Sequence, residues 1–154
     1  MELKTKMKAE EGKQEVFITR EFDLPLELLF RAYVEPDIVE QWMGTKVLNL
    51  ECKQLGSYHF ETSDPHGNKF SLIGVIHEFI PNYKITRTFE MENAGYGVQL
   101  EFLEFEKLTE DTSKLHMHIV FRSTFHRDQM LEIPFAYGLS MAHDRLQLIV
   151  KQLK

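Results

Sequence analysis

Residues 19–44 read TREFDLPLELLFRAYVEPDIVEQWMG, and two changes of pattern in this stretch decide the kind of fold to expect. The stretch opens at the end of the run EVFITREF, residues 15–22, whose β-branched and aromatic residues are typical of a β-strand. A short helix over residues 25–34 follows, because a first helical turn tolerates proline and apolar residues then recur at helical spacing. A second short helix begins at Pro36 and ends at Gly44.

The residues after Gly44 change period and predict an antiparallel meander. About six runs rich in β-branched and aromatic residues are separated by turn residues at a spacing of roughly 8–12 positions. The clearest turn is DPHGN, residues 64–68. Because the connections are short, we expect each strand to pair with the next one along the chain.

From about residue 127 the apolar period becomes helical again. Residues three or four positions apart share one face, and they are Phe135, Leu139, Ala142, Leu146, Ile149 and Leu153. The pattern predicts one long helix to about residue 153, with Pro134 either kinking it or marking its true start. The element order therefore predicts an α+β fold, in which a curved antiparallel sheet wraps around the C-terminal helix and leaves space between them.

Length and composition predict a single domain. The chain has 154 residues, of which 43% are hydrophobic, and this suffices for one core. Residues 1–14 are polar and rich in Lys and Glu, so we expect a flexible N-terminal segment followed by one domain over residues 15–154.

Charge and cysteine content narrow the classes of partner and compartment. Eighteen Lys and Arg against 24 Asp and Glu give a net charge of -6, so a nucleic-acid partner is not expected. A single cysteine, Cys52, excludes an intramolecular disulfide and fits the reducing cytoplasm. No apolar run has the length of a signal-peptide core or a membrane span, so neither export nor membrane insertion is expected.

The histidines predict no metal centre. His116 and His118 share one face of a strand, which alternation with apolar residues makes a half-exposed face, and no third ligand is apparent. His77 alternates with apolar residues and is a candidate for burial, whereas His143 is expected on the solvent side of the last helix.

The chain also lacks the motifs of nucleophilic, phosphate-binding and dinucleotide-binding sites. Glu101, Glu104 and Glu106 lie on one strand and are interpreted as solvated charges. We therefore expect no catalytic residue, cofactor or metal ligand. Trp42 and Met43, at the end of the second short helix, fit a pocket rim and an ordinary core equally well.

A resemblance to a known family emerges from these motifs. The opening pattern consists of Arg20, Pro25, Phe30, Ala32, Pro36, Trp42 and Gly44. It continues through the run Gly56 to Phe60, the turn at residues 64–68, and Asp144-Arg145-Leu146 in the last helix. Together these positions resemble the helix-grip (SRPBCC) proteins of the START/polyketide-cyclase superfamily, in the branch similar to the C-terminal domain of the heat-shock protein 90 ATPase activator. Met43, Thr45 and Leu139 depart from the pattern, replacing the usual Trp, Pro and Trp.

The resemblance implies a cavity between the sheet and the long helix that binds small hydrophobic or aromatic molecules. The residues expected to line it or form its rim are Trp42, Met43, Tyr58, Phe60, Phe89, Phe102, Phe135, Gly138 and Ala142. A protein-interaction module that assists a chaperone ATPase is the alternative function. A third is a polyketide cyclase or dehydratase, which needs an acid or base in the cavity, and its candidates are Tyr58, His77 and Tyr137.

Overall fold

The computed structural model describes residues 3–153. Within them lie eight strands, which are β1 (Lys6–Lys8), β2 (Glu15–Phe22), β3 (Lys46–Leu50), β4 (Ser57–Ser63), β5 (Lys69–Ile80), β6 (Lys84–Met91), β7 (Val98–Lys107) and β8 (Ser113–Val120). The helices of the same residues are α1 (Leu26–Val34), α2 (Pro36–Met43), α3 (Thr124–Glu132) and α4 (Phe135–Lys151).

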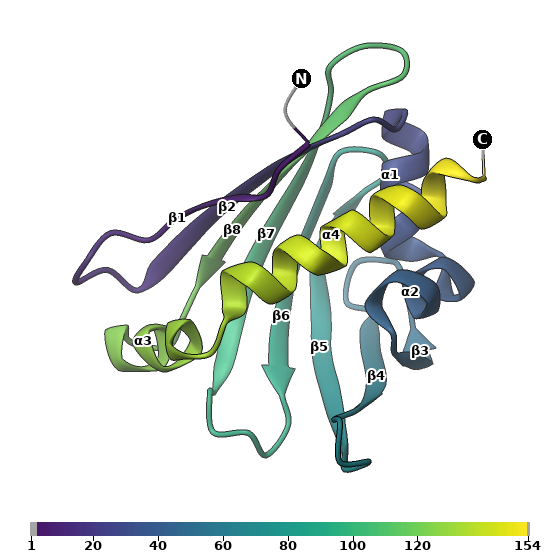
Figure 1. Cartoon of the computed structure of the whole chain (residues 1–154). Helices are drawn as coiled ribbons and strands as arrows, with labels where there is room; N and C mark the ends of the chain where they lie inside the picture. Colours follow the sequence, from purple (N-terminus) through teal and green to yellow (C-terminus); the bar gives the residue numbers. More distant parts are fainter. Residues whose placement is uncertain (1–2, 154) are drawn as a thin grey trace.

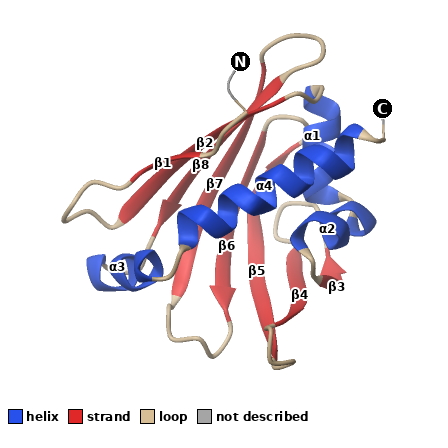
Figure 2. Ribbon diagram, viewed as in Figure 1, coloured by secondary structure: helices blue, strands red, loops and turns tan. Residues whose placement is uncertain are grey.

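All of these strands form one antiparallel sheet in the order β1-β2-β8-β7-β6-β5-β4-β3. From β3 to β8 each strand pairs with the next along the chain, which confirms the predicted meander. The sheet also joins the two ends of the fold, because β2 pairs with β8. Helix α4, yellow in Figure 1, crosses one face of the sheet, with α1 and α2 beside its C-terminal half (Figures 1 and 2). The fold is the expected α+β helix-grip arrangement.

The side chains of β8 show how the sheet separates its two faces. Leu115, Met117 and Ile119 are buried on the face covered by α4. His116 and His118 alternate with them and are half-buried on the outer face, as their spacing predicts. The apolar surface removed from water on the covered face supplies the main driving force for folding.

Two local features fix the short helices α1 and α2. Gly44 ends α2 with a φ of 64°, a left-handed conformation that glycine adopts without steric cost. Its N–H donates to the carbonyl oxygen of Glu40 at 3.1 Å. The indole Nε1 of Trp42 donates to the carbonyl oxygen of Ala32 at 2.6 Å, which ties α2 to α1.

The expected single C-terminal helix is wrong, because the chain forms two helices there. Helix α3 ends at Glu132, and Ile133 is extended with φ -78° and ψ 160°. The ring of Pro134 explains the break, since a residue before proline avoids the helical conformation and proline has no N–H to donate. Pro134 thus marks the start of α4, which is one of the two expected alternatives.

Part of the segment expected to be flexible, residues 1–14, forms a strand, and residues 1 and 2 lie outside the described part of the chain. Strand β1 lies within this segment and pairs with β2, with Met7 opposite Ile18. Thr5, just before β1, forms a hydrogen bond of 2.7 Å with His143 of α4. The segment therefore adds an edge strand to the sheet and contacts the C-terminal helix.

Candidate functional site

A cavity of about 240 Å³ lies between the covered face of the sheet and the first half of α4. Its walls come from α1, α2, β6, β7, β8, α3 and α4. Apolar side chains dominate them, and they include Met91, Met117, Ile119, Met130, Ile133 and Leu139. A concave apolar space with a few polar groups is the usual form of a small-molecule site.

Five of the residues predicted from the sequence line this cavity. They are Trp42, Met43, Phe89, Phe135 and Ala142. Phe135 and Ala142 face it from α4, and Trp42 and Met43 close it from the end of α2. Trp42 combines the two expected alternatives, pocket rim and ordinary core. It is only 4% exposed, as a core residue is, and it also forms part of the cavity wall.

Tyr58 and Phe60 lie elsewhere than predicted. Both are 2% exposed on β4, where their rings pack together at 5.2 Å, outside the cavity lining. The hydroxyl of Tyr58 donates to the carbonyl oxygen of Thr88. The space for this ring exists because Gly74 stands opposite it in β5.

Phe102 and Gly138 lie away from the cavity. Phe102 has the outward parity on β7 and stacks on His118 at 5.5 Å on the outer face of the sheet. Gly138 is exposed on α4, and a Cβ atom added to it would meet no atom within 4 Å. A side chain at position 138 therefore begins in open space.

The cavity wall also contains polar residues that the sequence pattern did not identify as part of the site. Across β6 and β7, Arg87 stands opposite Glu101, and its Nε donates to the carboxylate at 3.0 Å. The amide Nε2 of Gln99 donates to the other carboxylate oxygen at 3.0 Å. Glu101 is 5% exposed, so its interpretation as a solvated charge is wrong. The sequence carries no signal for this burial, because β7 has apolar residues on both of its faces.

Burial sets the electrostatics of this cluster. Burial opposes the charge of Arg87, but the neighbouring Tyr58 and the Glu101 carboxylate outweigh it, so the pKa of Arg87 is raised. The guanidinium also lies over the Tyr58 ring at 5.1 Å, a cation–π contact. Burial raises the pKa of Tyr33, which lines the same cavity, and its phenol stays protonated.

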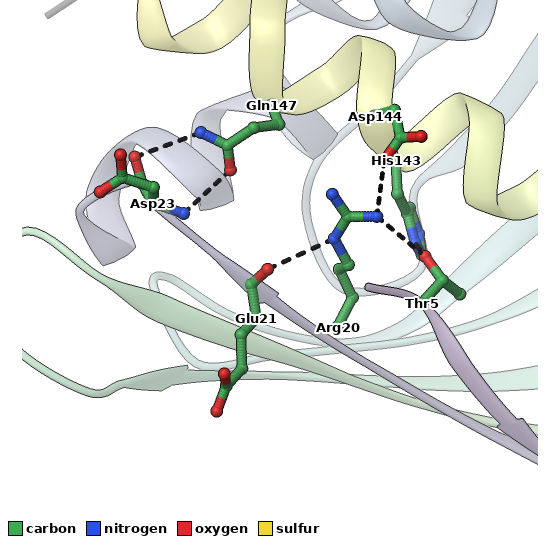
Figure 3. A network of polar contacts seen from close by, with 7 residues as sticks. All are labelled: Thr5, Arg20, Glu21, Asp23, His143, Asp144 and Gln147. Atoms are coloured by element: carbon green, nitrogen blue, oxygen red, sulfur yellow. Dashed lines mark hydrogen bonds and ion pairs between the residues drawn. The ribbon is translucent and has the colours of Figure 1, made fainter. Parts of the chain in front are cut away.

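Outside the cavity, a polar network joins α4 to β2 (Figure 3). Arg20, only 3% exposed, donates to Asp144 of α4 at 2.9 Å and to Thr5 at 3.3 Å. His143 contacts the same Thr5 hydroxyl and is fully buried, so its predicted place on the solvent side is wrong. Burial, and then the charge of Arg20, lower the pKa of His143 to about 3.

Further contacts fix α4 toward its C-terminal end. The side-chain amide of Gln147 accepts from the backbone N–H of Asp23 at 2.9 Å and donates to its carbonyl oxygen at 3.3 Å. Lys151 pairs with the carboxylate of Asp23. From α4, Arg145 donates to the carbonyl oxygen of Trp42 at 3.1 Å. These contacts fix the C-terminal half of α4 to residue 23 and to the end of α2.

The other candidate chemical groups lie away from the cavity. His77 is exposed, contrary to expectation, and Tyr137 is 67% exposed on α4. Tyr58 lies in the core, so none of the three residues proposed from the sequence as an acid or base lines the cavity. Burial raises the pKa of the Cys52 thiol, which disfavours the nucleophilic thiolate. Within residues 3–153, no group of three or more His, Cys, Asp or Glu is placed to hold a metal ion.

No helix in the described part of the chain combines the length and apolar character needed to cross a membrane.

Solved structures of low sequence identity share this fold. A Rhodobacter sphaeroides protein has a TM-score of 0.84 at 18% identity, covering 95% of this chain and 98% of its own. An Arthrobacter aurescens protein has a TM-score of 0.86 at 15% identity, with coverage of 96% and 91%. A Mycobacterium smegmatis protein has a TM-score of 0.85 at 17% identity, with coverage of 95% and 96%.

Sequence comparison gives the family. No curated protein matches the chain. The family described as Activator of Hsp90 ATPase homolog 1-like protein matches residues 23–151, which is most of the chain. The matched range includes both short helices, the meander and α4, and thus every wall of the cavity. The chain therefore belongs to the Activator of Hsp90 ATPase homolog 1-like family.

Proposed function

We propose that this protein binds a small apolar or aromatic molecule in the cavity between the sheet and α4. The observation that carries the proposal is a space of about 240 Å³ with mainly apolar walls. A dry apolar cavity of about 150 Å³ holds benzene, so the space here suits a molecule of about two fused rings. Burial of the ligand's apolar surface, at roughly 25 cal/mol per Å², would supply most of the affinity.

The composition of the wall supports a deformable site. Methionines from α2, β6, β8 and α3 contribute to it, and they are Met43, Met91, Met117 and Met130. Unbranched, polarisable side chains of this kind repack around ligands of different shape. The single free cysteine and the charge of -6 fit a cytoplasmic location, which is part of the same proposal.

Titration followed by the fluorescence of Trp42, the single tryptophan, tests the proposal directly. The panel consists of fatty acids, aromatic acids and naphthalene derivatives. We expect saturable binding of at least one class, and we expect Ala142→Phe to weaken it by about tenfold or more because the new ring occupies the cavity.

The matched control is Ala136→Phe, the same substitution at an exposed position of α4. It should leave the affinity unchanged. Equal binding by the wild type and both variants would place the ligand outside the cavity and refute the proposal.

The family description favours a second candidate, interaction with a chaperone ATPase. The outer face of the sheet offers a surface for it. There Phe17 is 43% exposed and stacks on His118, beside Phe102, in a hollow of about 390 Å³. Exposed apolar patches of this kind often mark protein contacts. The test is the ATPase rate of a purified heat-shock protein 90 with the wild type and with Phe17→Ser; a rate that the wild type does not change excludes this candidate.

A further inference from the structure

The carbonyl oxygen of Gln99 is a buried acceptor that lacks a partner. Gln99 lines the cavity and is 4% exposed. Its Nε2 donates to Glu101 at 3.0 Å, which fixes the orientation of the amide, since a flipped amide would set two oxygens against each other. Its Oε1 is shielded from water and has no hydrogen-bond partner among the described residues. An orphan acceptor of this kind is costly, and a ligand that brings a donor to it removes the cost.

Two further side chains with unused hydrogen-bonding capacity line the same cavity. Arg87 reaches Glu101 through Nε, and its terminal nitrogens donate to no described residue. The hydroxyl of Tyr33 likewise has no hydrogen-bond partner within residues 3–153, although its ring is 5% exposed and packs on Trp42. Three elements, α1, β6 and β7, thus place spare donors in one apolar space, beside the buried acceptor of Gln99.

The charge balance of the cluster restricts the ligand to neutral molecules. Arg87 and Glu101 are 9% and 5% exposed and neutralise each other at 3.0 Å. A carboxylate or an ammonium group in the cavity would add a third buried charge without a partner, which costs several kcal/mol. A hydroxyl group is uncharged, and it can donate to one partner and accept from another through a single atom.

We propose that Tyr33, Arg87, Gln99 and Glu101 form a polar subsite that selects an uncharged, mostly apolar ligand carrying one hydroxyl group. The proposal rests on the proposed function, because it assigns the polar end of the molecule that the cavity binds. The hydroxyl donates to Gln99 Oε1, after a small side-chain adjustment that opens this atom to the cavity. It accepts from Arg87 or Tyr33.

Three naphthalene probes of nearly equal size separate the two proposals. They are 2-naphthol, 2-methylnaphthalene, which replaces the hydroxyl by a methyl group, and 2-naphthoate, which carries a charge. Calorimetric titration of each into the protein measures the dissociation constants. We expect 2-naphthol to bind about tenfold more tightly than 2-methylnaphthalene, and 2-naphthoate to bind more weakly than both.

The outcomes are distinct. Equal affinity for 2-naphthol and 2-methylnaphthalene overturns the polar subsite and leaves the apolar cavity standing as the proposed function. Tightest binding of 2-naphthoate also overturns the subsite, because the site would then select an anion. Failure of all three probes to bind the folded protein overturns the polar subsite, and it overturns the proposed function as well when the fatty acids and aromatic acids of the panel also fail to bind.

Two variants assign the selectivity to the subsite. Gln99→Leu removes the orphan acceptor, and Tyr33→Phe removes a single oxygen atom, so one remains informative if the other fails to fold. Each should reduce the ratio of the affinities for 2-naphthol and 2-methylnaphthalene by about threefold or more, with little change for the methyl compound. A merely structural role would weaken both probes alike and leave the ratio unchanged. Tyr137→Phe, at an exposed position of α4, is the matched control, and a ratio that falls equally in it refutes the assignment.

Discussion

Replacing Glu101 by alanine should lower the free energy of unfolding by about 3–5 kcal/mol, because it leaves the guanidinium of Arg87 buried without a counter-charge. The structure sets this magnitude. The side chains of Glu101 and Arg87 are only 6% and 11% exposed, so water can compensate little of the loss. The carboxylate also accepts the amide of Gln99 at 3.0 Å, and alanine leaves this second donor without its partner.

Urea unfolding at neutral pH, followed by Trp42 fluorescence, measures the effect. The informative comparison is the double variant Arg87→Met/Glu101→Leu, which removes both charges and keeps the volume. It should recover much of the lost stability, since apolar replacement of a buried ion pair is often neutral or stabilising. Glu110→Ala is the control, because its ion pair with Lys107 is exposed, and its stability should stay close to that of the wild type.

Two results would refute this reasoning. A loss below about 1 kcal/mol for Glu101→Ala would be typical of a solvated ion pair, and the cluster would then be open to water. A double variant as unstable as the single one would mean that the loss comes from packing around Glu101 and has no connection with the unpaired charge of Arg87.

Other expected outcomes concern two glycines and one histidine. Gly74→Ala should cost about 1–3 kcal/mol, because its Cβ would lie 2.1 Å from the carbonyl oxygen of Thr88 and 2.5 Å from the hydroxyl of Tyr58. Gly138→Ala should instead stabilise α4 by about 0.5–1 kcal/mol, since its Cβ meets open space; urea unfolding measures both. The pKa of His143 falls from 6.5 to about 3 on folding, so between these pH values the unfolded state binds more protons and stability rises with pH. Unfolding measured at pH 7 and pH 5 should show that His143→Leu loses this part of the slope, at most about 1.4 kcal/mol per pH unit; an unchanged slope would contradict the lowered pKa.

Periodicity found the elements whose two faces differ in polarity. The alternation of Leu115, Met117 and Ile119 with polar residues identified β8 and its covered face. Helical spacing identified α4, and Pro134 indicated a kink or a start, but the spacing could not decide between the two or predict the separate helix α3 before it. Strand β1 was not predicted, because its three residues, KMK, are mostly charged and form a strand only by pairing with β2.

Strand β7 shows why the candidate site was predicted only in part. Its sequence VQLEFLEFEK places apolar residues on both faces, so the pattern gives no parity. Phe102, expected at the cavity, lies on the outer face, while Glu101, the next residue toward the N-terminus, faces inward and is buried. The register with β6 determines whether Glu101 can be buried, because it places Arg87 opposite Glu101 and makes burial of both charges possible. Long-range pairing of this kind is absent from a single sequence.

The contacts of α4 divide the helix into two parts with different tasks. Its first turns present Phe135, Leu139 and Ala142 to the cavity, and a Cβ at Gly138 would meet nothing. The anchors lie further along the helix, on the turns that carry the contacts to β2, Asp23 and Trp42. There Leu146 and Val150 are fully buried in the core. Because the anchors sit at one end and the cavity at the other, the residues that shape the binding space can change with little loss of the contacts that hold the fold.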